Sequence, residues 1–421
     1  MQAVVIAAGE SKRFWPLNNG IHKSQFKLLG KPLIYWALKG LAENGIADVM
    51  VVVSKNSTIQ EMLDKENDLG VKITYATQEE PLGTGNALWQ AKDFIKESFI
   101  LLWGNKVGSK ELVRKMLEDQ KRKNFDAVLV GTEVAHPSEY GVPRLGGETM
   151  IEIVENPEEG KEPSKVGIMG ARLLTPDFFK YYENLPKHHE ADLVDATNAY
   201  MQDKRISLLL IEGKGLTLKY PWDLFGIMDF LFASEYFEPR IASSAQVASN
   251  VVMRGPVYVG ENTIIKEGTI IEGPVYIGDN CKIGYNNVLR GPVNIEDDVH
   301  TTSFAEIKNS IMQEDVHMAS GFFGNSIAAS GCRFGAGFIT GNRRLDRENV
   351  TVKFNGQKIE TGLPRFGIAV GEKSVFGIHS GTMPGVLIGV NCKIGPATHV
   401  FENLEDNTTF YAKFDQVKKK D

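Results

Sequence analysis

The sequence is poor in cysteine and has no segment suited to export or to a membrane. Its 421 residues include three cysteines, Cys281, Cys332 and Cys392, an odd number without metal-ligand spacing. This usage is expected in a reducing compartment, and we predict a cytoplasmic protein. No run of about 18 apolar residues occurs, and the first segment, QAVVIAAG, has no basic stretch before it. We therefore expect neither secretion nor a membrane partner.

An excess of basic charge is missing as well. Lysine and arginine number 47 against 53 aspartates and glutamates, which gives a formal net charge of −6. Binding to a phosphate backbone requires clustered positive charge, so a nucleic acid is not an expected partner. The hydrophobic share of 42% is that of an ordinary globular protein. Because one core rarely extends beyond roughly 250 to 300 residues, the length predicts two domains.

The first half, residues 1–230, alternates short apolar runs with amphipathic stretches. The runs at 4–7, 49–53 and 99–103 are rich in β-branched residues and predict strands, while the stretches between them predict helices. This alternation predicts an α/β Rossmann-like domain with a mostly parallel sheet. Ligands of such sheets bind beyond the carboxyl ends of the strands, so we expect the chemistry in the loops there.

The second half, residues 231–421, follows a repeat of six. A period of six does not match a helix, and it predicts a solenoid whose flat faces each present one inward aliphatic side chain. The polar stretch at 340–366 interrupts the repeat and is interpreted as an inserted loop or hairpin. A helix is predicted within 222–237, where the halves join. The apolar positions at this spacing are Val247, Met253, Val259, Ile265, Ile271, Ile277, Ile283, Leu289 and Ile295.

The segment after the first predicted strand, AAGESKRFWPL, combines a glycine-containing turn with a cation. Backbone N–H groups of such a turn bind phosphate oxygens, and Arg13 and Lys23 supply positive charge for them. The spacing is neither that of a Walker A loop nor that of a GxGxxG turn. A surface turn with solvated Arg13 and Lys23 is the alternative.

These residues belong to a longer pattern, which resembles the signature of the sugar-1-phosphate nucleotidylyltransferases. The segment QEEPLGTGNAL at 78–88 resembles the one with which that family recognises uracil or thymine. The resemblance implies catalytic roles for Arg13 and Lys23, and it requires the 9–23 loop and the 78–84 turn to converge on one pocket. Thr84 is also expected to cap a helix. The matching signature residues are Gly9, Arg13, Pro16, Leu17, Lys23, Gly30, Lys31 and Pro32. The implied nucleotide-binding residues are Ala8, Gly9, Gln78, Gly83 and Thr84.

Three more stretches, EYGVPRL, IEIVENP and KYPWDLF, resemble the elements with which that family contacts sugar and metal. The implied sugar-binding residues are Gly141, Glu155, Lys165 and Trp103. The implied ligands of a Mg²⁺ cofactor are Asp223 and Asn105.

Some positions depart from the family pattern. Asn105 stands where the family has an aspartate, and an amide oxygen brings no charge to a hard cation, so Mg²⁺ affinity is expected to fall. Asn156 replaces a family lysine and Lys165 a family asparagine, an exchange that keeps one cation near the sugar phosphate. Lys106, beside Asn105, is a further cation able to neutralise phosphate charge.

The second half resembles the left-handed parallel β-helix of the bifunctional N-acetylglucosamine-1-phosphate uridylyltransferases/glucosamine-1-phosphate acetyltransferases and of the archaeal two-domain sugar-phosphate transferases. FGAGFITGN at 334–342 matches their acetyl-acceptor motif and implies that role for Asn342. Ala319 and Phe322 replace the family's base histidine and its tyrosine. His317 is therefore a substitute base, with acetyl-CoA as co-substrate, only if the coil is bulged. The resemblance also implies a homotrimer.

Three hypotheses follow from these resemblances. The first is transfer of a nucleotidyl group from UTP or dTTP to a sugar-1-phosphate, either N-acetylglucosamine-1-phosphate or glucose-1-phosphate, with release of pyrophosphate. The second is a bifunctional enzyme that also acetylates glucosamine-1-phosphate from acetyl-CoA. The third is a catalytically weakened subunit that binds a nucleotide sugar and regulates or scaffolds a partner.

Overall fold

The computed structural model describes residues 1–66, 68–123, 125–147, 149–211, 216, 218–415 and 417–419. The chain forms two compact units. Unit 1 comprises Met1–Ser11, Gly20–Phe26 and Lys31–Leu218, and unit 2 comprises Lys12–Asn19, Lys27–Gly30 and Lys219–Asp421. The division therefore falls before the helix α7 (Leu224–Ala233), whereas the sequence predicted it at residue 230.

Unit 1 is built on one sheet with the strand order β5-β4-β1-β6-β10-β7-β11-β9-β8. Strands β5, β4, β1 and β6 are mutually parallel, and β10 runs antiparallel between β6 and β7. This arrangement confirms the predicted Rossmann-like sheet. The strands are β1 (Gln2–Ala7), β4 (Asp48–Ser54), β5 (Lys72–Gln78), β6 (Phe99–Trp103), β7 (Ala127–Glu133), β8 (Gly141–Gly146), β9 (Thr149–Glu155), β10 (Val166–Leu174) and β11 (Ile206–Leu210), with the short β3 (Lys31–Pro32) outside the sheet.

Helices cover both faces of this sheet, as a doubly wound fold requires. On one face α3, α5 and α6 pack against side chains such as Val4 and Leu101, and on the other α1, α2 and α4 pack against Val5 and Leu102. Consecutive residues of β1 and β6 thus enter different cores, which explains their continuous apolar runs. The helices are α1 (Leu33–Glu43), α2 (Ile59–Glu66), α3 (Thr84–Trp89), α4 (Ser109–Lys123), α5 (Phe178–Glu183) and α6 (Asp192–Asp203), with 3₁₀ turns η2 (Lys23–Gln25) and η3 (Pro137–Glu139).

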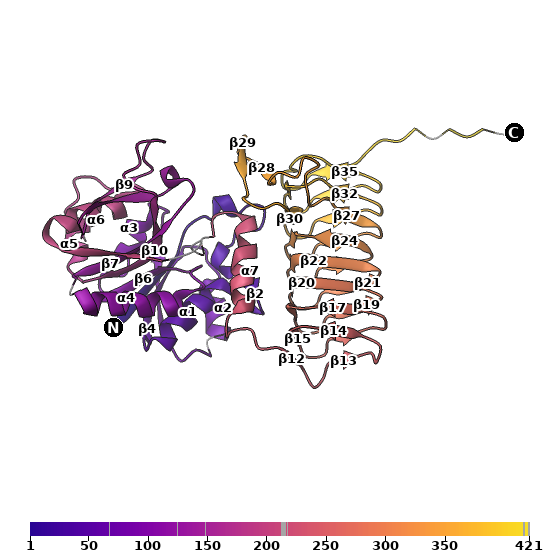
Figure 1. Cartoon of the computed structure of the whole chain (residues 1–421), viewed down its shortest axis with the longest axis horizontal. Helices are drawn as coiled ribbons and strands as arrows, with labels where there is room; N and C mark the ends of the chain where they lie inside the picture. Colours follow the sequence, from indigo (N-terminus) through magenta and orange to yellow (C-terminus); the bar gives the residue numbers. More distant parts are fainter. Residues whose placement is uncertain are drawn as a thin grey trace. The chain divides into compact units, whose positions relative to one another are not determined.

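Unit 2 is a left-handed parallel β-helix whose short strands stack coil upon coil (Figure 1). Val259 lies opposite Ile277 and Ile277 opposite Ile295 on successive coils, so one coil takes three hexads. The hexad residues from Val259 to Ile295 are at most 1% exposed, which confirms the inward positions. All three cysteines lie buried in the same core.

The polar insertion contains an antiparallel hairpin of β28 (Thr351–Phe354) and β29 (Gln357–Glu360). Its two-residue turn, Asn355-Gly356, has positive φ at both positions, which suits the twist of a tight hairpin. Ala328 and Val370 are paired on adjacent coils across this insertion, so the solenoid continues without a break in register.

No helix in the described part of the chain has the length and hydropathy of a membrane span.

The other elements of unit 2 are those that precede the solenoid and the solenoid strands themselves. The elements before the solenoid are η1 (Lys12–Phe14), β2 (Lys27–Leu28), η4 (Pro221–Asp223) and α7. The solenoid strands are β12 (Arg240–Ile241), β13 (Gln246–Val247), β14 (Val252–Arg254), β15 (Val257–Val259), β16 (Ile264–Ile265), β17 (Ile270–Glu272), β18 (Val275–Ile277), β19 (Lys282–Tyr285), β20 (Val288–Ile295), β21 (His300–Ser303), β22 (Ala305–Met312), β23 (His317–Met318), β24 (Gly321–Gly324), β25 (Ile327–Ala328), β26 (Arg333–Phe334), β27 (Phe338–Thr340), β30 (Ile368–Val370), β31 (Val375–Phe376), β32 (Gly381–Thr382), β33 (Val386–Ile388), β34 (Lys393–Ile394), β35 (His399–Val400) and β36 (Thr409–Phe410).

Candidate functional site

The last residue of β5, Gln78, is buried and holds the turn that follows it. Its Nε2 donates to the carbonyl oxygen of Gly83 at 2.9 Å and to Oδ1 of Asn86 at 3.0 Å. A carbonyl oxygen cannot donate, so these bonds fix which end of the carboxamide is Nε2. Within the described residues no hydrogen bond is made by Oε1, which leaves an acceptor available to a ligand. Asn86, which the sequence analysis did not single out, is part of this arrangement.

The turn itself has no space for side chains at two of its positions. A Cβ on Gly83, whose φ is +98°, would lie 2.6 Å from the backbone oxygen of Glu190, and one on Gly85 would lie 2.1 Å from Oδ1 of Asp192. Gly83 is the N-cap of α3, so the expectation that Thr84 caps this helix is wrong, and Thr84 is the first helical residue. The fully buried Asp192 beside the start of α3 was also missed by sequence reasoning, although two glycines in one short turn are a signal of close approach.

Two lysines of unit 1 lie next to the carboxyl end of β6. Lys106 is 7% exposed and its Nζ donates to the carbonyl oxygen of Leu216 at 3.1 Å. The Nζ of Lys23 donates to the carbonyl oxygen of Leu218. Burial, and then the charge of Lys23, lower the pKa of Lys106 to about 8. Concentrated positive charge at the end of a parallel strand is suited to a polyanionic ligand.

The loop that begins at Ala8 and Gly9 approaches the segment that carries Lys23. The backbone N–H of Lys23 donates to Oγ of Ser11 at 3.0 Å, and the Nε2 of His22 lies 4.0 Å from the position of a Cβ on the exposed Gly9. Burial and the charge of Lys23 lower the pKa of His22 to about 3, so this imidazole is neutral at physiological pH. An exposed glycine backbone beside a lysine segment matches the expected phosphate turn.

Two of the predicted charged residues, Arg13 and Asp223, belong to unit 2. Arg13 is exposed on η1. The Oδ2 of Asp223 accepts the backbone N–H groups of Lys219 at 2.7 Å and Tyr220 at 2.8 Å, which fixes the orientation of this carboxylate. The 9–23 loop is thus divided between the units, and its convergence with the 78–84 turn on one pocket stays a prediction.

Strands β8 and β9 bring two of the predicted sugar-binding residues together. Gly141 pairs with Glu155, and a Cβ on Gly141 would lie 2.8 Å from the Glu155 carboxylate. Desolvation raises the pKa of Glu155, while Arg172 acts in the opposite direction. Lys165 is exposed just before β10, and its carbonyl oxygen accepts the N–H of Val134 at 3.0 Å.

Trp103, predicted to bind the sugar, and Asn105, predicted to bind the metal, lie at the end of β6. Trp103 is half-buried, and its indole occupies the space above Gly170, where a Cβ would come within 2.7 Å of the ring. Asn105 is 5% exposed, and its carbonyl oxygen accepts the N–H of Val107 at 3.1 Å. Among the residues that the structure describes, no group of three or more His, Cys, Asp or Glu side chains is arranged to hold a metal ion.

In unit 2, His317 and Asn342 have separate environments. The ring of His317 stacks on His300 at 4.5 Å, and its Nε2 lies 3.2 Å from Oδ1 of Asp315. Strand β23 pairs with β21 and β26 at both of its residues, and His317 lies opposite His300 and Arg333. The Nδ2 of Asn342 donates to Oδ1 of Asn325 at 2.8 Å. No hydrogen bond joins His317 to Asn342 in the described structure, and the role of His317 as a substitute base stays a prediction.

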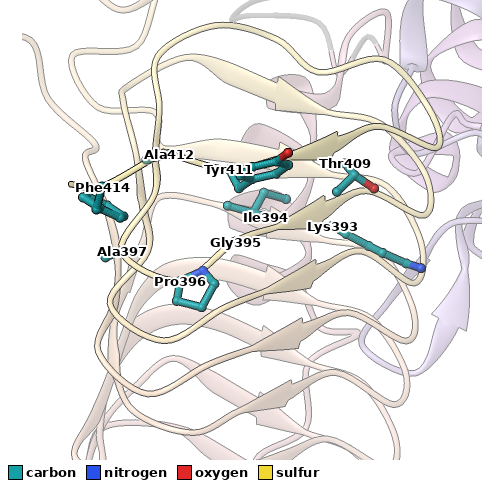
Figure 2. Close-up of a pocket in the computed structure, with 9 residues that line it drawn as sticks. All are labelled: Lys393, Ile394, Gly395, Pro396, Ala397, Thr409, Tyr411, Ala412 and Phe414. Atoms are coloured by element: carbon teal, nitrogen blue, oxygen red, sulfur yellow. The ribbon is translucent and has the colours of Figure 1, made fainter. Parts of the chain in front are cut away.

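A hollow of about 590 Å³ lies at the C-terminal end of the solenoid (Figure 2). Most of its lining is apolar, and none of the predicted site residues contributes to it. The lining residues are Lys393, Ile394, Gly395, Pro396, Ala397, Thr409, Tyr411, Ala412 and Phe414.

Comparison with known proteins shows similarity along nearly the whole chain. The model of the family described as nucleotidyl transferase matches residues 2–216. The chain is 33% identical to the bifunctional protein GlmU of Methanococcus maripaludis strain C7, over 99% of this chain and 98% of that protein. It is 30% identical to the bifunctional sugar-1-phosphate nucleotidylyltransferase/acetyltransferase of Sulfurisphaera tokodaii, over 95% and 97% of the two chains. Among solved structures, a UDP-glucose pyrophosphorylase from Acinetobacter baumannii aligns with a TM-score of 0.49 and 20% identity, over 56% of this chain and 94% of the other.

Proposed function

Because the chain belongs to the nucleotidyl transferase family, we propose that it transfers a nucleotidyl group from a pyrimidine nucleoside triphosphate to a sugar-1-phosphate and releases pyrophosphate. The observation that carries this proposal is the pair of lysines, Lys23 and Lys106, that share one environment at the carboxyl edge of the parallel sheet. Such charge is needed where two anionic substrates must be held together.

The reaction needs no protein nucleophile. An oxygen of the sugar-1-phosphate attacks the α-phosphorus of the triphosphate, the bond from that phosphorus to the bridging oxygen breaks, and pyrophosphate leaves with the electron pair. Lys23 and Lys106 neutralise the charge that collects on the phosphate oxygens, and the backbone at Ala8 and Gly9 donates hydrogen bonds to them. Arg13 is proposed to act in the same way. Positioning of the two substrates supplies the rest of the rate enhancement.

Base recognition is assigned to Gln78 and the turn at Gly83 and Thr84. The N3–H of uracil or thymine is a donor, and the Oε1 of Gln78 is an acceptor that its own Nε2 contacts hold in place. Cytosine has no hydrogen on N3, so this oxygen disfavours it. UTP and dTTP present the same edge and are both proposed substrates.

Magnesium is proposed as the cofactor, with Asp223 and Asn105 as protein ligands. Mg²⁺ is commonly bound through one or two carboxylates and completed by substrate phosphates, and an oriented Asp223 carboxylate with one amide oxygen fits that chemistry. When bound, the ion would supply Lewis-acid neutralisation of phosphate charge. Since one carboxylate is missing, the chain's own lysines take a larger share of this task.

The sugar is proposed to contact Gly141 and Glu155, with Lys165 and Trp103 as further contributors. The carboxylate over Gly141 offers an acceptor for sugar hydroxyls, and the indole offers an apolar face. N-acetylglucosamine-1-phosphate and glucose-1-phosphate are the proposed acceptors. We also propose a cytoplasmic location, which the supply of nucleoside triphosphates requires, and a homotrimer formed through the β-helix.

Pyrophosphate release tests the function directly. The full-length protein is incubated with Mg²⁺, either UTP or dTTP, and each sugar phosphate in turn, with CTP as the control nucleotide. Turnover with UTP or dTTP and much less with CTP is expected. No pyrophosphate from any pair, together with tight binding of a nucleotide sugar, would support the regulatory alternative instead.

Acetyl transfer to glucosamine-1-phosphate is the second candidate, because the relative from Sulfurisphaera tokodaii is named for both activities. Its candidate base is His317, whose Nε2 contacts Asp315 and whose ring stacks on His300; a carboxylate in that place orients an imidazole and favours its taking a proton. Release of coenzyme A from acetyl-CoA, compared between the wild type and His317→Ala, decides whether acetyl-CoA is a co-substrate and whether His317 takes part.

A further inference from the structure

Two short segments of the N-terminal half belong to unit 2, and they border the segment that carries Lys23. Lys12–Asn19 precedes Gly20–Phe26, and Lys27–Gly30 follows it. The first segment is bound through Nε1 of Trp15, which donates to Oδ1 of Asp406 at 3.1 Å. The second segment is bound by more contacts, and two of them are made by a buried amide and a buried carboxyl group of the solenoid.

Asn294 and Glu296 of the solenoid bind the turn at Leu29 and Gly30. The N–H of Leu29 donates to Oδ1 of Asn294 at 2.8 Å, and the N–H of Gly30 donates to Oε1 of Glu296 at 3.3 Å. The same Oε1 accepts Nδ2 of Asn294 at 2.8 Å. Both side chains are 0% exposed. Burial of an amide and a carboxyl in a solenoid is costly unless they have partners. The two turn amides are partners of Asn294 Oδ1 and Glu296 Oε1, whereas Oε2 of Glu296 has no partner among the described residues.

The bound turn has a backbone conformation that needs support. Leu29 has a φ of +54° and Gly30 a φ of +75°, and the left-handed region is unfavourable for a leucine. Lys27, at the start of the segment, is held on both sides: its Nζ lies 2.8 Å from Oε1 of Glu314, and its carbonyl oxygen accepts Nε2 of Gln313 at 3.0 Å. The conformation of this turn therefore depends on the solenoid.

We propose that Asn294 and Glu296 are positioning residues for nucleotidyl transfer, which act by fixing the turn that borders the Lys23 segment. The proposal rests on the proposed function of the chain. It gives the β-helix a part in the transferase reaction. The two residues do not touch the reacting atoms, and they act through the backbone of Leu29 and Gly30.

The test compares Asn294→Ala with a matched control, Asn287→Ala. Asn287 is also a fully buried asparagine of the solenoid, but its partners, Thr301 and Ala305, are solenoid residues. Both variants should lower the midpoint of thermal unfolding. We expect Asn294→Ala to lower kcat by about tenfold to a hundredfold with a smaller change in KM for the nucleotide, because a small misplacement of reacting groups has effects of that size. Asn287→Ala should stay within about twofold of the wild type.

A second experiment probes the turn contact itself. A Cβ on Gly30 would lie 2.3 Å from the hydroxyl oxygen of Tyr276 but 3.3 Å from its Cζ. Gly30→Ala should therefore lower both kcat and the unfolding midpoint, and Tyr276→Phe in the same chain should restore part of each loss. The strain of alanine at positive φ remains in the double variant, and Tyr276→Phe alone provides the reference.

The outcomes of these experiments distinguish failure of the proposed nucleotidyl transfer from failure of the positioning role of Asn294 and Glu296. A wild type without pyrophosphate release overturns the proposed function, whereas the Gly30 and Tyr276 midpoints still report whether the turn contacts the solenoid. If the wild type is active and Asn294→Ala loses no more kcat than Asn287→Ala, the positioning role is overturned. Partial rescue of kcat in the Gly30→Ala, Tyr276→Phe chain supports it, and absence of any rescue in both kcat and midpoint contradicts it.

Discussion

Buried polar side chains have different partners in the two units. In the solenoid, Thr263 and Thr269 each donate to a glycine carbonyl 15 residues further along, so their bonds stay within the repeat. In unit 1, Gln78 and Lys106 instead bind the backbone of loops at the carboxyl edge of the sheet. Asn294 follows the second pattern although it lies in the solenoid. In the solenoid, a buried polar side chain whose partner lies outside the repeat, as that of Asn294 does, is therefore a candidate for holding a loop in place.

The largest effect is expected from replacing Lys23, which belongs to the polar side chains at the carboxyl edge of the sheet of unit 1. Lys23→Met removes a charge proposed to act on the phosphates, and we expect kcat to fall about a hundredfold or more, the range seen when one transition-state donor is lost. Pyrophosphate release under saturating substrates measures it. Lys115→Met, at an exposed lysine of α4, serves as the control. A loss of less than about threefold would contradict the assignment of Lys23 to the phosphates.

The second test concerns the base turn. Gln78→Ala removes the acceptor for N3–H and the two bonds that hold the turn, so we expect the KM for UTP to rise about tenfold, as for one buried hydrogen bond. Gln90→Ala, on an exposed glutamine that donates to Asn86 O, is the control. Initial rates with UTP, dTTP and CTP provide the measurement. Unchanged discrimination against CTP in Gln78→Ala would show that this residue does not read the base.

A smaller effect is expected on the Mg²⁺ concentration that gives the half-maximal rate. Asn105→Asp adds a carboxylate to a donor set that has one, and we expect the Mg²⁺ concentration for half-maximal rate to fall about threefold to tenfold. Titration of Mg²⁺ at fixed nucleotide in the wild type and the variant measures the change. Asn44→Asp, at an asparagine near the end of α1, is the charge-matched control. Equal half-saturation in Asn105→Asp and the wild type would remove Asn105 from the metal site.

The smallest expected effect is a pH dependence of stability from Glu296. Burial raises its pKa to about 8, Glu314 and Asp297 act in the same direction, and Asn294 and the Gly30 amide oppose them. Because the folded pKa exceeds the ordinary value of 4.5, its stabilising contribution is full below about pH 4.5 and is lost as the pH rises through about 8.

Glu296→Gln cannot ionise, so its free energy of unfolding should decline less than that of the wild type between pH 5 and pH 8. The difference between the two proteins should change by at most about 1.4 kcal/mol for each pH unit. Urea unfolding followed by circular dichroism at both pH values measures it, with Glu306→Gln on the exposed side of β22 as the control. Parallel pH profiles of the wild type and Glu296→Gln would contradict a buried, protonated Glu296.

The features of the fold that depend on local periodicity could be predicted from the sequence. The hexads predicted the inward positions because each coil takes three of them, and the apolar runs predicted the parallel strands β1, β4 and β6. The place of Gln78 at the end of β5 was not predicted, because no apolar run marks that strand. The division of the 9–30 region between the units was not predictable, because it depends on contacts such as Leu29 with Asn294, which are 265 residues apart. Thr84 was misjudged as a cap because the close approach of Glu190 to Gly83 is a tertiary effect.

The three cysteines, Cys281, Cys332 and Cys392, are spaced along the stack of coils, and each is buried as a free thiol. Burial raises the pKa of Cys281 and of Cys332 to about 12, so neither sulfur ionises while its coil is closed. A thiol-modifying reagent can react with them only after local opening. The relative labelling rates of the three sulfurs would thus report, without any engineered probe, from which end the stack unravels.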